Sequence, residues 1–174
     1  MKISSRTITI TGFLIALSIL LTRVASIRLA IGGVEGIRIG FGGLPIILGG
    51  ILFGPLYGGI IGAFSDILGY IINPIGAYMP HFTLTSALTG IIPSLILKIN
   101  QKNEINVFKL GIAVTVGQVI TSLILVPYFI HTIFGIPWVA LMPARIIATP
   151  INIVIYINII NILIKRDILR PAIE

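Results

Sequence analysis

The sequence predicts an all-α integral membrane protein with six transmembrane helices and with both termini, N and C, in the cytoplasm. Hydrophobic residues make up 56% of the 174-residue chain, charged residues only 10%, and the mean hydropathy is +1.12. A soluble domain carries about 25% charged residues, because much of its surface faces water. In addition, a run of 27 uncharged residues, positions 39–65, contains glycines at intervals of four. Glycine lets helix backbones approach closely in lipid, so we expect a tightly packed hairpin there.

The first predicted span covers residues 8–29, close to the roughly 20 residues that a bilayer requires. No small-residue cleavage site follows it, so we expect a retained span rather than a signal peptide. Gly12 and Ala16 form a small-xxx-small pair suited to close helix contact, within this chain or with a partner. Residues 30–40 (AIGGVEGIRIG) contain Glu35 and Arg38 and are expected to form an exposed loop, a candidate lid.

The second and third predicted spans cover residues 42–53 and 56–72, with a tight turn at Gly54 and Pro55 between them. The second span is short, so flanking residues extend it or Pro45 breaks it. The glycine series in this region comprises Gly50, Gly54, Gly58 and Gly62 and is continued by Asp66.

The remaining spans are predicted at residues 82–97, 107–130 and 139–164, as parts of one domain covering residues 1–174. Thr83 is a candidate N-cap for the fourth span. The fifth span has Pro127 near its end, and the sixth contains Pro143, Arg145 and Pro150.

The distribution of lysine and arginine predicts the orientation, because cytoplasmic loops carry an excess of both. With six spans, the opposite loops hold only Arg28 and Arg38. The basic residues on the side of the termini are Lys2, Arg6, Lys98, Lys102, Lys109, Lys165, Arg166 and Arg170. The net charge of +7 therefore indicates membrane topology, and no nucleic-acid partner is expected.

Three ionisable residues fall at membrane depth: Arg23, Asp66 and Arg145. Each costs about 2.5–3.5 kcal/mol to insert, so such residues normally pair or line a polar cavity. An internal ion pair with Asp66 would account for one arginine and leave a positive charge over. That surplus suits an anionic ligand, since guanidinium binds carboxylates in a bidentate manner. Asp66 is predicted to be structural.

Aromatic residues suggest a second part of the site. Tyr78 and Phe82 flank a proline-rich turn and are candidates for stacking on a flat ring, whereas Trp138 fits the interfacial belt. His81 and His131 are too isolated to indicate a metal site. The chain has no GxxxxGK[ST] motif, no HExxH and no credible Ser-His-Asp arrangement. We therefore expect a binding subunit, not an enzyme, without a cofactor or a metal.

The run RIGFGGLPIILGGILFGPLYGGIIGAFSDILGY, followed by GAYMPHFTLTSALTG, resembles the S components of energy-coupling factor (ECF) vitamin transporters. Within that group it most resembles the folate-specific members, and the match extends from Arg23 in LLTRVASIRL to Arg145 in MPARII. The sequence departs from the family pattern at His81, where glycine is common, and at Thr89, where arginine is common.

The resemblance implies a six-helix bundle in the bacterial cell membrane that captures a vitamin, here folate, from outside. Its implied partners are a transmembrane scaffold subunit (the T component) and two cytoplasmic ATPases. It also implies that the segment 30–40 is a gate. Expected ligand-binding residues are Arg23, Arg38, Tyr78, Phe82, Thr83 and Arg145. Expected partner-interface residues are Gly12, Ala16, Gly58 and Gly62.

Three alternatives stay open at this stage. The first is another vitamin or precursor, such as pantothenate or a deazapurine. The second is a lipid-modifying membrane enzyme, against which no clustered acidic residues for a metal are found. The third is a purely structural membrane subunit.

Overall fold

The computed structural model describes residues 5–23, 27–31, 34–74, 78–99 and 106–165, and in the two strands it describes the backbone only. Its elements are α1 (Ser5–Arg23), β1 (Ile27–Ile31), β2 (Val34–Ile39), α2 (Gly43–Phe53), α3 (Pro55–Ile72), α4 (Pro80–Ile99), α5 (Val107–Gln118), the π-helix η1 (Val119–Leu125), α6 (Val126–Phe134) and α7 (Trp138–Lys165). Five helical segments of this described part are long and apolar enough to cross a membrane, and α2 is a shorter apolar helix. The predicted helical, multi-pass membrane architecture is confirmed.

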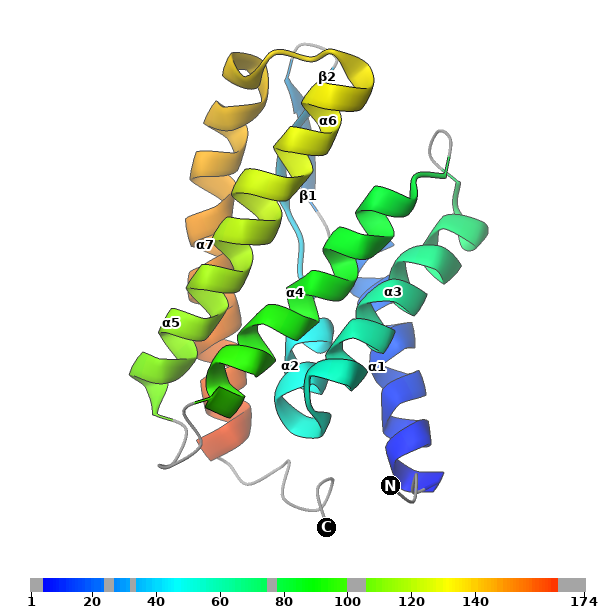
Figure 1. Ribbon diagram of the computed structural model, residues 1–174, viewed down its shortest axis with the longest axis vertical. Helices are drawn as coiled ribbons and strands as arrows, with labels where there is room; N and C mark the ends of the chain where they lie inside the picture. Colours follow the sequence, from blue (N-terminus) through cyan, green and yellow to red (C-terminus); the bar gives the residue numbers. More distant parts are fainter. Residues whose placement is uncertain (1–4, 24–26, 32–33, 75–77, 100–105, 166–174) are drawn as a thin grey trace.

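The long helices run roughly along the long axis of the molecule and form a bundle (Figure 1). The start of α1 and the end of α7 lie at one end, together with the α2–α3 turn and the facing ends of α4 and α5. The β-hairpin and the α6–α7 connection lie at the opposite end. Helix α5, η1 and α6 form one continuous rod, which matches the fifth predicted span but is longer by four residues at its C-terminal end.

The first predicted span was too long, and the loop predicted at residues 30–40 is wrong. Helix α1 ends at Arg23, and the chain then forms the antiparallel hairpin β1–β2, in which Arg28 pairs with Arg38 and Ile27 with Ile39. The cause is visible in the sequence, because residues 27–29 (IRL) and 37–39 (IRI) alternate apolar and polar side chains with the period of a strand.

Helix α2 is short because it covers only part of a crossing. Its 11 residues span about 16 Å, roughly half the hydrocarbon thickness of a bilayer. Strand β2 precedes it and extends this crossing toward the hairpin end (Figure 1). Pro45 does not break the helix, because it sits in the first turn, where no intrahelical donor is required. Residues 44–50 of α2 are all buried, so this helix is surrounded by protein.

The glycine-rich run forms the predicted turn and a close helix contact. Gly54 has φ +97°, a conformation that favours glycine, and Pro55 then starts α3. A Cβ on Gly58 would lie 2.8 Å from both the Cα of Gly50 in α2 and the carbonyl oxygen of Gly90 in α4. The backbones of α2, α3 and α4 therefore meet at three glycines. This cluster, Gly50–Gly58–Gly90, is called the glycine contact below.

Helix α4 begins at Pro80, earlier than predicted, so the N-cap assignment of Thr83 is wrong. Thr83 lies within the first turn of the helix, and its hydroxyl donates a hydrogen bond to Asp66 of α3 instead. Pro93, inside α4, packs against Gly117 of α5. Glycine at position 117 leaves room for the proline ring, so it permits close contact between α4 and α5.

Candidate functional site

A cavity of about 720 Å³ opens between the helices, and every long helix contributes to its wall. Such a volume lies within the range of small-molecule sites, about 300–1,000 Å³. The wall includes the end of α1, the C-terminal half of α3, the first half of α4, the rod from Gln118 to Phe134 and one face of α7. The segment that joins β2 to α2 also lines it, through Gly40 and Gly42, as does the start of α2, through Gly43 and Ile46.

Two arginines and one carboxylate line this cavity: Arg23, Arg145 and Asp66. Arg23 is the last residue of α1 and reaches α3, where its Nη2 would lie 3.4 Å from a Cβ on Gly69. Arg145 stands on α7, and its Nη1 donates a long hydrogen bond of 3.4 Å to the carbonyl oxygen of Ser122. The formal charges leave one positive charge in excess among the described wall residues, as the sequence predicted. A site of this kind suits an anionic ligand.

Asp66 accepts a hydrogen bond of 2.7 Å from the Thr83 hydroxyl, whose oxygen lies 2.8 Å from the hydroxyl of Tyr78. This chain of contacts links α3 to the start of α4 and fits the structural role predicted for Asp66. The same carboxylate also faces the cavity. Tyr78 and Thr83 are not among the residues that line the cavity. Tyr78 instead contacts Tyr70, a wall residue, with 5.3 Å between ring centroids.

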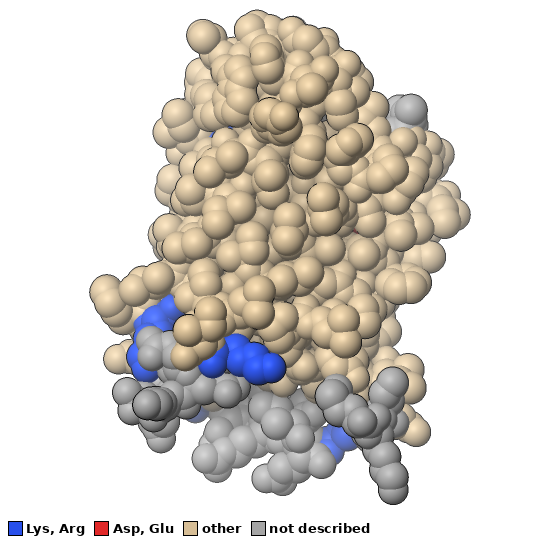
Figure 2. Space-filling model, viewed as in Figure 1, with Lys and Arg blue, Asp and Glu red and all other residues tan. Residues whose placement is uncertain are grey.

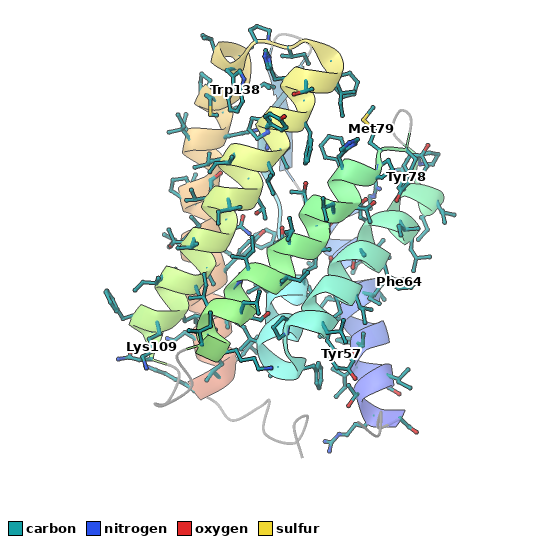
Figure 3. All side chains as sticks on the ribbon, in the orientation of Figure 1. Tyr57, Phe64, Tyr78, Met79, Lys109 and Trp138 are labelled. Atoms are coloured by element: carbon teal, nitrogen blue, oxygen red, sulfur yellow. The ribbon has the colours of Figure 1, made fainter. Side chains whose placement is uncertain are left out.

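Two predicted ligand residues remain, and the structure describes the side chain of Phe82 but not that of Arg38. Phe82 lines the cavity, as expected for an aromatic wall residue. Arg38 is on β2, and its side chain lies outside the described part of the structure. Tyr78 and Trp138 lie toward the hairpin end of the molecule, opposite Lys109 (Figure 3). Trp138 is not a wall residue and lies beside His131, with 6.0 Å between ring centroids.

Polar wall residues on α7 and on the α5–α6 rod were missed at the level of sequence. On α7 they are Thr149, Asn152 and Tyr156, which share one helical face with Arg145. On the rod they are Gln118, Thr121 and Ser122. The signal that could have found them is their helical spacing inside otherwise apolar spans, since polar residues at membrane depth face a cavity or a neighbouring helix.

Ser65, next to Asp66, was also missed. It is 7% exposed and lines the cavity, and its Oγ has no hydrogen-bond partner within the described structure. An unsatisfied buried hydroxyl is unfavourable, and a polar ligand group in the cavity would satisfy it. Ser65 is therefore a candidate ligand contact.

Two hydrogen bonds hold the connection between the β-hairpin and α2. The Ser18 hydroxyl of α1 donates to the carbonyl oxygen of Gly42 over 2.8 Å, and the Tyr156 hydroxyl of α7 donates to that of Gly40 over 2.5 Å. Gly42 also packs against Thr22, where a side chain would overlap the threonine hydroxyl. The base of the hairpin is thus attached to two helices that border the cavity.

The four residues predicted at a partner interface differ in exposure. Gly12 and Ala16 are exposed on α1, and a Cβ on Gly12 would meet nothing within 4 Å. Gly58 and Gly62 are buried, and a side chain on either would overlap backbone atoms of α4. Their assignment to a partner surface is therefore wrong: these glycines serve packing inside the chain.

Basic side chains gather at one end of the surface, on the face shown in Figure 2. Among described residues, Arg6, Lys98, Lys109 and Lys165 belong to helix ends at this end of the molecule. The class that the fold and the cavity define is a helical membrane protein with a cationic cavity of small-molecule size.

The chain belongs to the family described as ECF-type riboflavin transporter, S component, whose model matches residues 2–167. The chain is therefore a transport subunit and not an enzyme. It is 40% identical over 124 residues to the folate transporter FolT of Clostridium novyi (strain NT), covering 71% of this chain and 67% of that protein.

Two solved structures are similar to this fold. A crystal structure of FolT bound with folic acid matches with a TM-score of 0.75 and 25% identity, over 91% of this chain and 95% of the other. The S component of a bacterial ECF transporter matches with a TM-score of 0.67 over the same shares, and at 18% identity this second likeness concerns the fold alone.

Proposed function

We propose that this chain is the S component that captures folate for an ECF-type transporter. The observation that carries the proposal is the cavity wall, in which Arg23 and Arg145 outnumber the single carboxylate of Asp66. The glutamate tail of folate is dianionic at neutral pH and suits surplus guanidinium groups. Its flat pterin suits the aromatic wall residues Tyr70 and Phe82. The similarity to FolT supports the same ligand.

Riboflavin is the second candidate, because the matching family model carries that description. Riboflavin is flat but has no carboxylate, so it would leave the cationic wall without an anionic partner. This difference in charge separates the two ligands. The charged wall favours folate.

Isothermal titration calorimetry of the purified protein with folic acid tests the proposal. We expect saturable binding that excess riboflavin and pantothenate do not displace. Binding of riboflavin without binding of folic acid would replace the first candidate with the second. Mass spectrometry of ligand retained through purification provides an independent readout, since it does not depend on the choice of probe.

Direct ligand contacts are proposed for Arg23, Phe82 and Arg145, with Ser65 added from the structure. Tyr78 and Thr83 would act one step away, by holding Asp66 and Tyr70 at the wall. Arg38 stays a predicted ligand residue at the entrance. The β1–β2 hairpin would be the gate, pivoting at the segment that Ser18 and Tyr156 hold.

The proposed partners are a T component and two cytoplasmic ATPases, and the proposed orientation places both termini in the cytoplasm. Support comes from the basic residues at the end of the molecule where α1 starts and α7 ends. The proposed scaffold contact is the exposed pair Gly12 and Ala16 on α1.

Replacing Gly12 or Ala16 with leucine tests that contact. We expect loss of folate uptake by cells that express the complete transporter, with unchanged calorimetric binding to the isolated subunit. If ligand binding falls while the complex still assembles, this face belongs to the bundle and not to a partner.

A further inference from the structure

The rod α5–η1–α6 changes its hydrogen-bond register inside the cavity wall. In η1 the amide of Val126 donates to the carbonyl oxygen of Thr121, five residues back, instead of four as in an α-helix. Thr121, Ser122 and Val126 all line the cavity. The register change thus occurs at the wall.

Pro127 follows directly on this bond and interrupts the register. The next amide in the same pattern would belong to residue 127, and its acceptor five residues back would be the carbonyl oxygen of Ser122. Proline has no N–H, so it cannot make that bond. The carbonyl oxygen of Ser122 accepts from the Nη1 of Arg145 on α7, over 3.4 Å. A side chain from another helix therefore occupies the acceptor that Pro127 leaves unused.

The neighbouring hydroxyls do not compete for this acceptor. Thr121 donates to the carbonyl oxygen of Gly117 over 2.8 Å, and Ser122 donates to Oε1 of Gln118 over 3.1 Å. Arginine has five N–H donors, and the contact with Ser122 uses one of them. The contact helps to orient the planar guanidinium at the wall.

We infer that Pro127 is a positioning residue for ligand binding: by withholding an amide from the Ser122 carbonyl, it gives that oxygen to Arg145 and holds the guanidinium at the cavity wall. The inference rests on the proposed function, because it takes the ligand to carry a carboxylate. Pro127 itself is buried and is not a wall residue, so its effect on the ligand passes through Arg145.

Replacing Pro127 with alanine restores an N–H that competes with Arg145 for the carbonyl. Two ligands of nearly equal shape separate this effect from general damage to the cavity: folic acid and its dimethyl ester, which lacks the tail charges. We expect affinity for folic acid to fall about tenfold, as for loss of a hydrogen bond to a charged group. Affinity for the ester should stay within about twofold, since Arg145 has no carboxylate to hold there.

A double mutant gives a second readout. In an Arg145→Ala protein, adding Pro127→Ala should cause no further loss of affinity for folic acid, because the two residues act as one unit. Pro127→Gly supplies the same N–H without a methyl group and should reproduce the loss. Alanine is a better helix former than proline, so the ligand-free melting temperature should not fall.

Pro150→Ala is the matched control. Pro150 also lies inside a long helix, but it is exposed and does not line the cavity. Its replacement should leave both affinities unchanged.

Three results would overturn the inference while leaving folate capture in place. They are a Pro127→Ala protein that keeps its affinity for folic acid, an equal loss for both ligands, and a loss that adds to that of Arg145→Ala. Failure of the wild-type protein to bind folic acid would instead reject the proposed function, so the two failures are distinguishable.

Discussion

The two sides of the cavity are built in opposite ways. On one side α2, α3 and α4 meet backbone to backbone at the glycine contact, and the Ser86 hydroxyl of α4 donates to the carbonyl oxygen of Gly62 over 2.8 Å. On the other side the rod and α7 contain prolines, a π-helix and a row of polar wall residues. The comparison teaches that the two sides, which both supply cavity-wall residues, are held together by different means. Small residues bring helices together, whereas an interrupted hydrogen-bond register provides polar groups at the cavity.

Gly58→Leu should have the largest effect, because it disrupts the closely packed contact among α2, α3 and α4. Even a Cβ at this position lies 2.8 Å from Gly50 and from the Gly90 carbonyl, so leucine forces the three backbones apart. We expect a loss of about 3 kcal/mol or more in unfolding free energy, at the upper end of measured overpacking costs. Thermal unfolding in detergent measures it.

Gly12→Leu is the control for that prediction, since a side chain there meets nothing within 4 Å. Its melting temperature should match that of the wild-type protein. Equal melting temperatures for Gly58→Leu and the wild-type protein would show that the glycine contact is not a rigid part of the bundle.

Arg145→Ala tests the polar side and should have the next largest effect. It removes a cationic wall residue, and truncating one member of a buried charge pair typically costs about 2–5 kcal/mol of binding. Affinity for folic acid should fall at least about thirtyfold by calorimetry, with little change in melting temperature. Arg6→Ala, at the start of α1 and outside the cavity, should leave affinity unchanged. A purely structural subunit would show no difference between the two variants.

Ser65→Ala should have the smallest effect. Comparing it with Ser86→Ala contrasts two serine hydroxyls on α3 and α4, the closely packed side of the cavity. The Ser65 hydroxyl lacks a partner in the described structure, so its removal should leave ligand-free stability equal or slightly higher. Affinity for folic acid should fall about fivefold, as for a neutral hydrogen bond. Ser86 also lines the cavity, but its hydroxyl already bonds across to α3, so Ser86→Ala should lose about 1 kcal/mol of stability. Unchanged affinity in Ser65→Ala would remove Ser65 from the proposed site.

Much of the helical framework could be predicted, because the hydropathy of a segment and the prolines and glycines at its ends determine a span from local sequence alone. The Gly54–Pro55 turn and the spans beginning near residues 56, 107 and 139 match the structure within one residue. The end of α1 was missed because an apolar run has the same composition as a helix or as a strand. Only the alternation after Ile27 separates the two.

The charged residues of the cavity wall could be predicted from the sequence, whereas its neutral polar residues could not. Arg23 and Arg145, which line the cavity, were candidates because a charge inside a membrane is costly and normally pairs or faces a polar cavity. Ser65, Asn152 and Gln118 were missed because a lone neutral polar residue in a span has many acceptable environments. Tyr78 and Thr83 do not line the cavity although Phe82 does, because proximity in the sequence does not reveal which side chains face it.

The sequence by itself determined that this chain crosses a membrane several times, roughly where most of its helices lie, and that it carries a surplus of positive charge within its spans. Those properties follow from the cost of exposing polar groups to lipid, which each segment meets on its own. Only the tertiary structure decided that Gly58 and Gly62 face α4 and that α2 is surrounded by protein. It also decided that Arg145 meets the carbonyl oxygen of Ser122, because these contacts join residues from helices that only the folded bundle brings together.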